Sequence, residues 1–290
     1  NDPKILADSY GRLGYAYSAN NMMVEAIQYF EKWLNIKKQL KGKKKLIAPL
    51  VDITDCLIEL ESYEHAKHHI IELSEAIEAN PESKYYENFK QLDKIMQAQL
   101  LTVTQKHKEA LQILNKIDTT KIKRKLLKIR YFNVLRKTHE SLKNFALGEL
   151  YLDKEYKYNK NRTNVSNIEY YIEKLSYALH ANNSKKADTY FKKITKIVLI
   201  NNKNKKFERC FVLSRYYASK KEFQKAFLFL ESAWFLKNSN DRFIAKNKID
   251  VDQYYIKYNK QLQEITQLSA SKDEVITKNR SLYINTTVFI

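Results

Sequence analysis

The stretch SYGRLGYAYSANNMMVEAIQYF, residues 9–30, decides the fold of this chain. Leu13 and Tyr17 are four residues apart, so they share one face of a helix. Gly14 beside them is small enough to let a second helix approach closely, and Ala26 does the same from the other side. The stretch therefore predicts two helices packed against each other through a short turn.

An alanine recurs at the corresponding place in five further stretches of the sequence. Successive alanines are 36 to 44 residues apart, and a period of that size is typical of stacked helix pairs rather than of one globular core. The six positions are Ala26, Ala66, Ala110, Ala146, Ala187 and Ala226. We expect each of them to lie early in the second helix of a pair.

The composition also favours an all-α fold. The 290 residues include only 4 Gly and 3 Pro, far below the usual shares of roughly 7% and 5%. Sheets and their hairpins need such turn residues, whereas short turns between helices can be made from Asn, Lys and Ser. The hydrophobic fraction of 44% is ample for a continuous core.

The first copy resembles the tetratricopeptide repeat, whose pattern it matches at Tyr10, Leu13, Gly14, Tyr17, Ala26 and Phe30. The sixth copy repeats this pattern with Leu213, Ser214, Tyr217, Ala226, Leu230 and Ala233. The resemblance implies an all-α, right-handed superhelical solenoid of about six helix pairs over residues 1–240. Residues 241–290 are then expected to form a long C-terminal helix.

The resemblance also implies a concave groove lined by the first helices of the pairs. In the family geometry the ninth repeat position faces that groove, and here it is occupied by Tyr15, Asp55, Gln99, Leu135, Ser176 and Arg215. The polar members could hold a peptide or protein ligand, with Arg215 available for a carboxylate. The alternative is that several of these side chains only cover the helix surface.

The chain is strongly basic, since 52 Lys and Arg against 33 Asp and Glu give a net charge of +19. Basic clusters fall between the repeats, at 41–45, 121–125, 157–162 and 203–206. Turns of that kind would line one edge of a solenoid and could attract an acidic partner, a membrane surface or phosphates. They could equally be solvated turns. We do not expect the array itself to bind nucleic acid directly, because its aromatic residues occupy helix-packing positions.

No pattern in the sequence indicates an enzyme, a cofactor or a metal. Cys56 and Cys210 are too few for a disulfide framework, and each is expected to be a small buried hydrophobe. Glu61, His65, His68 and Glu72 share a helix face, but the neighbouring alanine, isoleucine and leucine mark the opposite face as the buried one. We therefore expect these four side chains to be solvated rather than to hold zinc.

The C-terminal fifty residues carry a different pattern. Apolar residues recur at steps of four and three, at Val251, Tyr255, Tyr258, Leu262, Ile265 and Leu268. Such a seam is suited to capping the array or to pairing with another helix, so it predicts a homodimer through the C-terminal helix. Residues 280–290 then begin with an arginine and become apolar, as the start of a membrane span does, although a span needs about 20 residues.

That ending is similar to the sensor region of Bacteroidetes-type membrane-attached regulators. In those proteins a repeat array leads through a long helix and one membrane span to a DNA-binding domain or a histidine kinase. The resemblance implies a ligand-binding sensor module for bacterial signalling or transcription regulation, whose output domain is not part of these residues. It would be attached to a membrane, with the array in the periplasm or the cytoplasm. The alternatives are a self-contained, soluble cytoplasmic scaffold for protein–protein interaction and a basic nucleic-acid-binding repeat.

Overall fold

The computed structural model describes residues 2–40, 46–158, 164–195 and 203–287. These residues form helices and turns, with no strand among them. The chain divides into two compact units, residues 1–245 and 246–290, each considered by itself below. The expectation of an all-α protein is confirmed over the described ranges.

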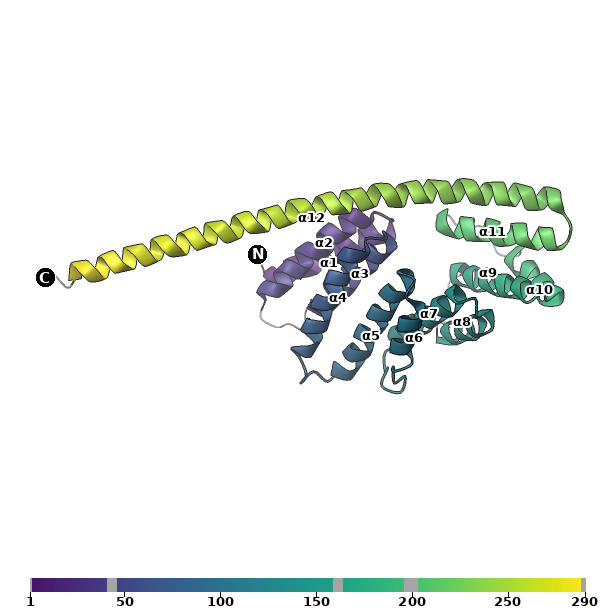
Figure 1. Ribbon diagram of the computed structural model, residues 1–290, viewed down its shortest axis with the longest axis horizontal. Helices are drawn as coiled ribbons and strands as arrows, with labels where there is room; N and C mark the ends of the chain where they lie inside the picture. Colours follow the sequence, from purple (N-terminus) through teal and green to yellow (C-terminus); the bar gives the residue numbers. More distant parts are fainter. Residues whose placement is uncertain (1, 41–45, 159–163, 196–202, 288–290) are drawn as a thin grey trace. The chain divides into compact units, whose positions relative to one another are not determined.

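Twelve helices are described, and they are labelled in chain order in Figure 1. Their bounds are α1 Pro3–Ala19, α2 Met23–Gln39, α3 Ile47–Glu59, α4 Tyr63–Glu78, α5 Tyr86–Val103, α6 His107–Leu114, α7 Lys125–Ser141, α8 Phe145–Tyr158, α9 Asn164–His180, α10 Ser184–Thr195, α11 Lys203–Ser219 and α12 Phe223–Thr287.

The helices of the first unit pack in consecutive helix–turn–helix pairs. The most extensive contacts join α1 to α2, α3 to α4, α5 to α6, α7 to α8 and α9 to α10. The second helix of each of the first four pairs also contacts the first helix of the next pair. First helices meet one another as well, because α5 contacts both α3 and α7, and α11 contacts α9. This arrangement is that of a helical repeat.

All six pairs share one turn. A single residue with a positive φ ends each first helix, and the next N–H donates a hydrogen bond back to a carbonyl five residues earlier, at 2.8 to 3.0 Å. This is the geometry of a Schellman C-cap. The six left-handed residues are Asn21, Glu61, Gln105, Lys143, Asn182 and Lys221. None of them is glycine, so glycine content gives no sign of these turns.

The turns fix the register of the repeats and correct one predicted position. In five pairs the alanine identified from the sequence lies five residues after the left-handed residue and is buried. In the fourth pair that place belongs to Gly148, which is buried, whereas Ala146 is exposed. A Cβ at Gly148 would lie 3.0 Å from the Tyr177 hydroxyl. Ala146 does lie early in α8, as predicted, but the close contact in that pair is made by Gly148.

Close helix contact in the first pair depends on the small residue predicted there. Gly14 is buried, and a Cβ added to it would overlap the Phe30 ring. About one turn further along α1, Tyr17 stacks on Tyr29 with ring centroids 5.1 Å apart. Rings stack at the same register in the fourth and sixth pairs, as His139–Tyr151 and Tyr217–Phe229. Sequence spacing therefore predicted the packing between paired helices correctly.

The second unit consists of the later part of α12, which is helical to Thr287. Residues 288–290, at the end of the apolar run, lie outside the described residues. Among the helices described, none combines the length and the apolar character that a bilayer crossing requires.

Candidate functional site

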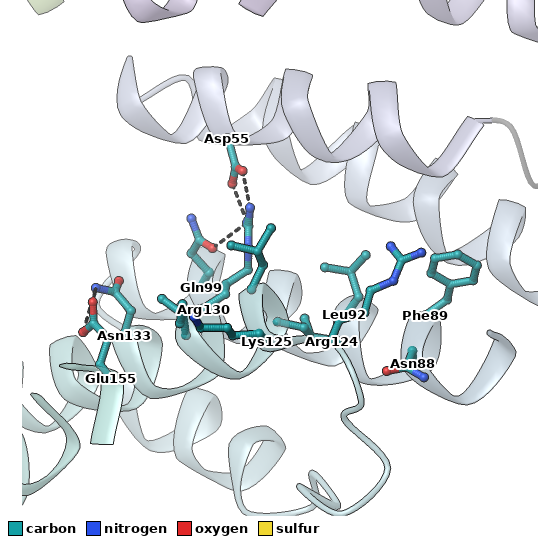
Figure 2. Close-up of a pocket in the computed structure, with 13 residues that line it drawn as sticks. Asp55, Asn88, Phe89, Leu92, Gln99, Arg124, Lys125, Arg130, Asn133 and Glu155 are labelled. Atoms are coloured by element: carbon teal, nitrogen blue, oxygen red, sulfur yellow. Dashed lines mark hydrogen bonds and ion pairs between the residues drawn. The ribbon is translucent and has the colours of Figure 1, made fainter. Parts of the chain in front are cut away.

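A cavity of about 820 Å³ lies at the meeting of α3, α5, α7 and α8 (Figure 2). The first helices supply nearly all of its lining, as the repeat register predicts for a groove. Its walls are formed by Asp55, Asn88, Phe89, Leu92, Gln99, Arg124, Lys125, Leu126, Leu127, Ile129, Arg130, Asn133 and Glu155. Polar and apolar side chains occupy different parts of this lining.

The polar part is organised by Arg130 of α7. Its two terminal nitrogens donate to the two carboxylate oxygens of Asp55 on α3, one of them at 2.6 Å, as the dashed lines in Figure 2 show. The same guanidinium lies 3.3 Å from the side-chain oxygen of Gln99 on α5. Burial alone would lower the pKa of Arg130, but Asp55 raises it. A bidentate pair of this kind fixes the positions of three first helices relative to one another.

A second polar group lies where α7 meets α8 and α9. Glu155 accepts hydrogen bonds from Asn133 at 3.3 Å and from Arg136 at 3.4 Å. Arg136 also lies 2.8 Å from Glu140 and 3.3 Å from Glu173. Burial, helped by the neighbouring carboxylates, raises the pKa of Glu173 to about 7 against the attraction of Arg136. The carboxylates are thus gathered around one buried arginine.

The apolar part of the cavity is open to solvent. Leu126, in the first turn of α7, has 80% of its surface exposed, and it shares the lining with Leu92 and Phe89 of α5. Arg124 lies over the rings of Tyr85 and Phe89, at 5.1 and 5.8 Å from their centroids. Together with Lys125 it places two cations beside an apolar wall. Such a surface suits an apolar side chain that is followed by an acidic group.

The structure places all the predicted groove residues on first helices, but it brings only some of them together. Asp55 and Gln99 both line the cavity and meet at Arg130. Tyr15 instead donates a hydrogen bond to Asp52 at 2.5 Å. Burial raises the pKa of Asp52 to about 6, although this hydrogen bond opposes the shift.

Two other predicted positions lie apart from the cavity lining. Ser176 of α9 is half-buried, and Arg215 of α11 lies 3.1 Å from a ring nitrogen of His180. Arg215 therefore already has a neighbour from the preceding pair.

The prediction for Leu135 was wrong, because the register of the fourth pair was counted from Ala146 instead of Gly148. Leu135 is buried, with 2% of its surface exposed, and belongs to the core. Counted back from the turn residue Lys143, the groove position of the fourth pair is Lys137. Arg130 is seven residues before Lys137 and so lies on the same helix face, a signal that the corrected register would have provided.

Of the four His and Glu side chains expected to be solvated, Glu61 and His68 are exposed, but His65 and Glu72 of α4 are half-buried, contrary to expectation. Glu72 pairs with Lys38 of α2 and with His69, a residue that the sequence reading did not single out. The buried His69 lies 3.2 Å from Glu31 of α2. Burial opposes both shifts, yet these partners raise the pKa of His69 and lower that of Glu72 to about 2. The group links α2 to α4, and no cluster in the described residues is suited to a metal ion.

Only part of the basic pattern can be placed. Residues 41–45 and 159–163 and the side chains of 203–206 lie outside what is described. In the cluster at 121–125, Lys121 is 3.3 Å from Glu87, and Ile122 is buried. The backbone N–H of Lys123 donates to Asn88 at 2.9 Å. This cluster is therefore built into the rim of the cavity.

Comparison with protein-family models finds no match to the chain, and comparison with curated protein sequences finds none either.

Proposed function

We propose that the chain is a non-enzymatic binding module of six tetratricopeptide-like pairs stacked as a right-handed solenoid, and that it holds a peptide segment of a partner protein. The ligand would place an apolar side chain against Phe89, Leu92 and Leu126. An acidic group beside it would meet Arg124 and Lys125. The carrying observation is that the cavity is formed by first helices and joins an apolar wall to a cationic rim.

The ion pairs among the polar side chains of the cavity support this orientation of the ligand. The charge of Asp55 is matched by Arg130, and that of Glu155 is shared with Arg136. Lys125, by contrast, is exposed at the start of α7. A ligand would therefore gain most from the apolar wall and the two rim cations, and the Asp55–Arg130 pair would serve to hold the wall in place.

The proposal can be tested with a phage-displayed library of random dodecapeptides, selected against residues 1–290. We expect enriched peptides that combine a large apolar residue with Asp or Glu. Their affinity, measured by fluorescence polarisation, should fall about 10-fold or more for Leu126→Asp, because the apolar contact is lost and the added charge repels the acidic group.

Ile5→Asp is a matched control, because Ile5 is also exposed at the start of a helix but does not line the cavity. Lys125→Glu should weaken acidic peptides and leave neutral ones nearly unchanged. Selection of no peptide, or equal affinities for Leu126→Asp and Ile5→Asp, would contradict the proposal. Circular dichroism of each variant checks that the helices are retained.

We further propose that this binding serves a sensor rather than a free scaffold. The support is the C-terminal sequence, where the four-and-three seam leads to an apolar run ending at Ile290. The coding sequence that follows residue 290 tests this directly. About ten further apolar residues and an output domain are expected, whereas a stop codon at that point would leave the scaffold alternative.

A further inference from the structure

The first turns of α12 carry a stripe of large, exposed apolar side chains. Its members are Phe223, Phe227, Leu230 and Trp234, which are 68%, 64%, 47% and 66% exposed. Their spacing of four, three and four residues keeps them on one face of the helix. The neighbouring face of α12 packs against α11, since Ala226 and Ala233 are buried and Phe229 stacks on Tyr217.

The same positions are fully buried in the first pair. The left-handed residues Asn21 and Lys221 are 200 residues apart, so each residue of α2 corresponds to one 200 residues later in α12. The counterparts of the stripe are Met23, Ile27, Phe30 and Leu34, which are at most 5% exposed. Helix α2 is covered by α3 of the next pair. Phe30 also packs on Gly14 of α1, so these positions in the first pair are enclosed by the partner helix together with the next pair, and the stripe on α12 lacks the cover of a next pair.

The described part of the chain does not supply that cover next in sequence. Every earlier second helix from α2 to α8 ends and leads into another first helix, whereas α12 continues as one helix from Phe223 to Thr287. No turn follows Trp234 within it. An exposed stripe of this size and chemistry is typical of a protein–protein contact.

We propose that a second copy of this chain covers the stripe, with the two α12 helices packed antiparallel about a twofold axis. The spacing is palindromic, since four, three and four residues read the same from either end. Reversing one helix therefore sets Phe223 against Trp234 of the second copy and Phe227 against Leu230 of the second copy. All four layers then join two large apolar side chains, as a self-complementary interface requires.

Charge selects the antiparallel direction. Lys237 and Asp241 continue the same four-and-three spacing beyond Trp234. In a parallel pair each of them would face its own counterpart, and like charges facing each other at core positions destabilise a helix pair. In the antiparallel pair centred on the stripe this repulsion between identical residues does not arise. Gln224 instead comes next to Glu231 of the second copy, where the two side chains can form a hydrogen bond.

The area is adequate for a specific dimer. At the exposures given above, the four side chains would lose roughly 500 Å² per copy. A standard interface takes about 800 Å² from each partner, so the stripe would supply most of it and flanking polar residues the remainder. The contact is distinct from the cavity on α3, α5, α7 and α8, and it does not depend on the function proposed for that cavity.

The oligomeric state of residues 1–290 tests the proposal by sedimentation equilibrium. We expect a species of twice the 34.5 kDa chain mass. Phe227→Lys should raise the dimer dissociation constant about 30-fold or more, because a charge would replace a central contact. Phe235→Lys is the matched control, since Phe235 is 69% exposed on the same helix but lies off the stripe. It should leave the dimer intact.

Mixing two weakened variants tests the pairing itself. Leu230→Glu should also be monomeric, and an equimolar mixture of Phe227→Lys with Leu230→Glu should form a heterodimer, because the new lysine and glutamate face each other only in the antiparallel arrangement. A monomeric wild-type chain, open-ended oligomers, or equal effects of Phe227→Lys and Phe235→Lys would overturn the proposal. A mixture that stays monomeric while each variant keeps its helix content would overturn the antiparallel pairing.

Discussion

Helix α2 and the first turns of α12 have the same register and opposite surroundings. Phe30 is 1% exposed and its counterpart Leu230 is 47% exposed. The charged position one residue on behaves in the same way, because Glu31 is buried beside His69 whereas Glu231 is exposed. The difference teaches that the pattern of large residues marks where a helix can be covered. Burial then depends on whether another helix follows.

The other end of the array supports this reading. Leu13 of α1 is 42% exposed, although Ile53 and Leu213, at the same place in the second and sixth pairs, are buried. Helix α1 begins at Pro3, and no second helix precedes it among the described residues. The first and last helices thus expose the faces that the inner pairs bury.

The largest difference in stability is expected when the side chain at the same position is shortened in α2 and in α12. Phe30→Ala should lower the free energy of unfolding by about 3–5 kcal/mol, because a cavity remains between α1, α2 and α3. Leu230→Ala should cost less than about 1 kcal/mol in the monomer. Urea denaturation at a concentration that favours the monomer measures both. Equal losses of unfolding free energy in the two variants would contradict the comparison, because they would mean that Leu230 is covered as fully as Phe30.

Removing the charge of the next residue in α2, Glu31, should give a change in stability of intermediate size. Glu31→Gln should cost about 1–3 kcal/mol near pH 6, because His69 loses the partner that raises its pKa. A histidine with a raised folded pKa contributes its full stabilisation below its ordinary pKa of about 6.5 and loses it as pH rises through the folded value. The difference between wild type and Glu31→Gln should therefore narrow toward pH 9.

The control for this pH series is Glu231→Gln, which should follow wild type within about 0.5 kcal/mol at every pH. On the acidic side, the stabilisation from Glu72 is present above its ordinary pKa and is lost as pH falls toward its folded pKa of about 2. A Glu31→Gln curve parallel to wild type from pH 6 to 9 would exclude a contribution from His69.

The smallest expected effect concerns the turns that set the two registers. Lys221→Gly should stabilise the chain by about 0.5–1 kcal/mol, because lysine pays a steric cost in the left-handed region that glycine does not. Asn21→Gly should gain only a few tenths, since asparagine tolerates that conformation better. Thermal unfolding of the two variants, measured at the same protein concentration, resolves this difference in stability. A larger gain at Asn21 would contradict this explanation of the turns.

Much of the local architecture could be predicted because it depends on neighbours along the helix. The spacing of Leu13, Gly14 and Tyr17 indicated a close helix pair, and the overlap of a Gly14 side chain with Phe30 bears this out. The fourth pair was misread because an alanine happens to lie two residues before Gly148, and both residue types fit the pattern. The left-handed turn residue that fixes the register of this pair is a lysine, and a lysine in a sequence does not indicate a left-handed conformation.

The candidate site was only partly predictable. Asp55 and Gln99 were identified from their register, but Arg130, which joins them, is 75 residues from Asp55 in the chain. His69 was missed because its partners Glu31 and Glu72 come from two different helices. Charge pairs across helices leave no periodic trace in a sequence.

The sequence by itself determined that this protein is built from helix pairs and where small and large residues occur in each. Those features follow from contacts three and four residues apart, which any stretch of helix contains. Only the tertiary structure decided that Asp55 meets Arg130, that Gly148 rather than Ala146 takes the close contact, and that the stripe on α12 is open. These depend on which pair follows which, and on how far the next helix reaches.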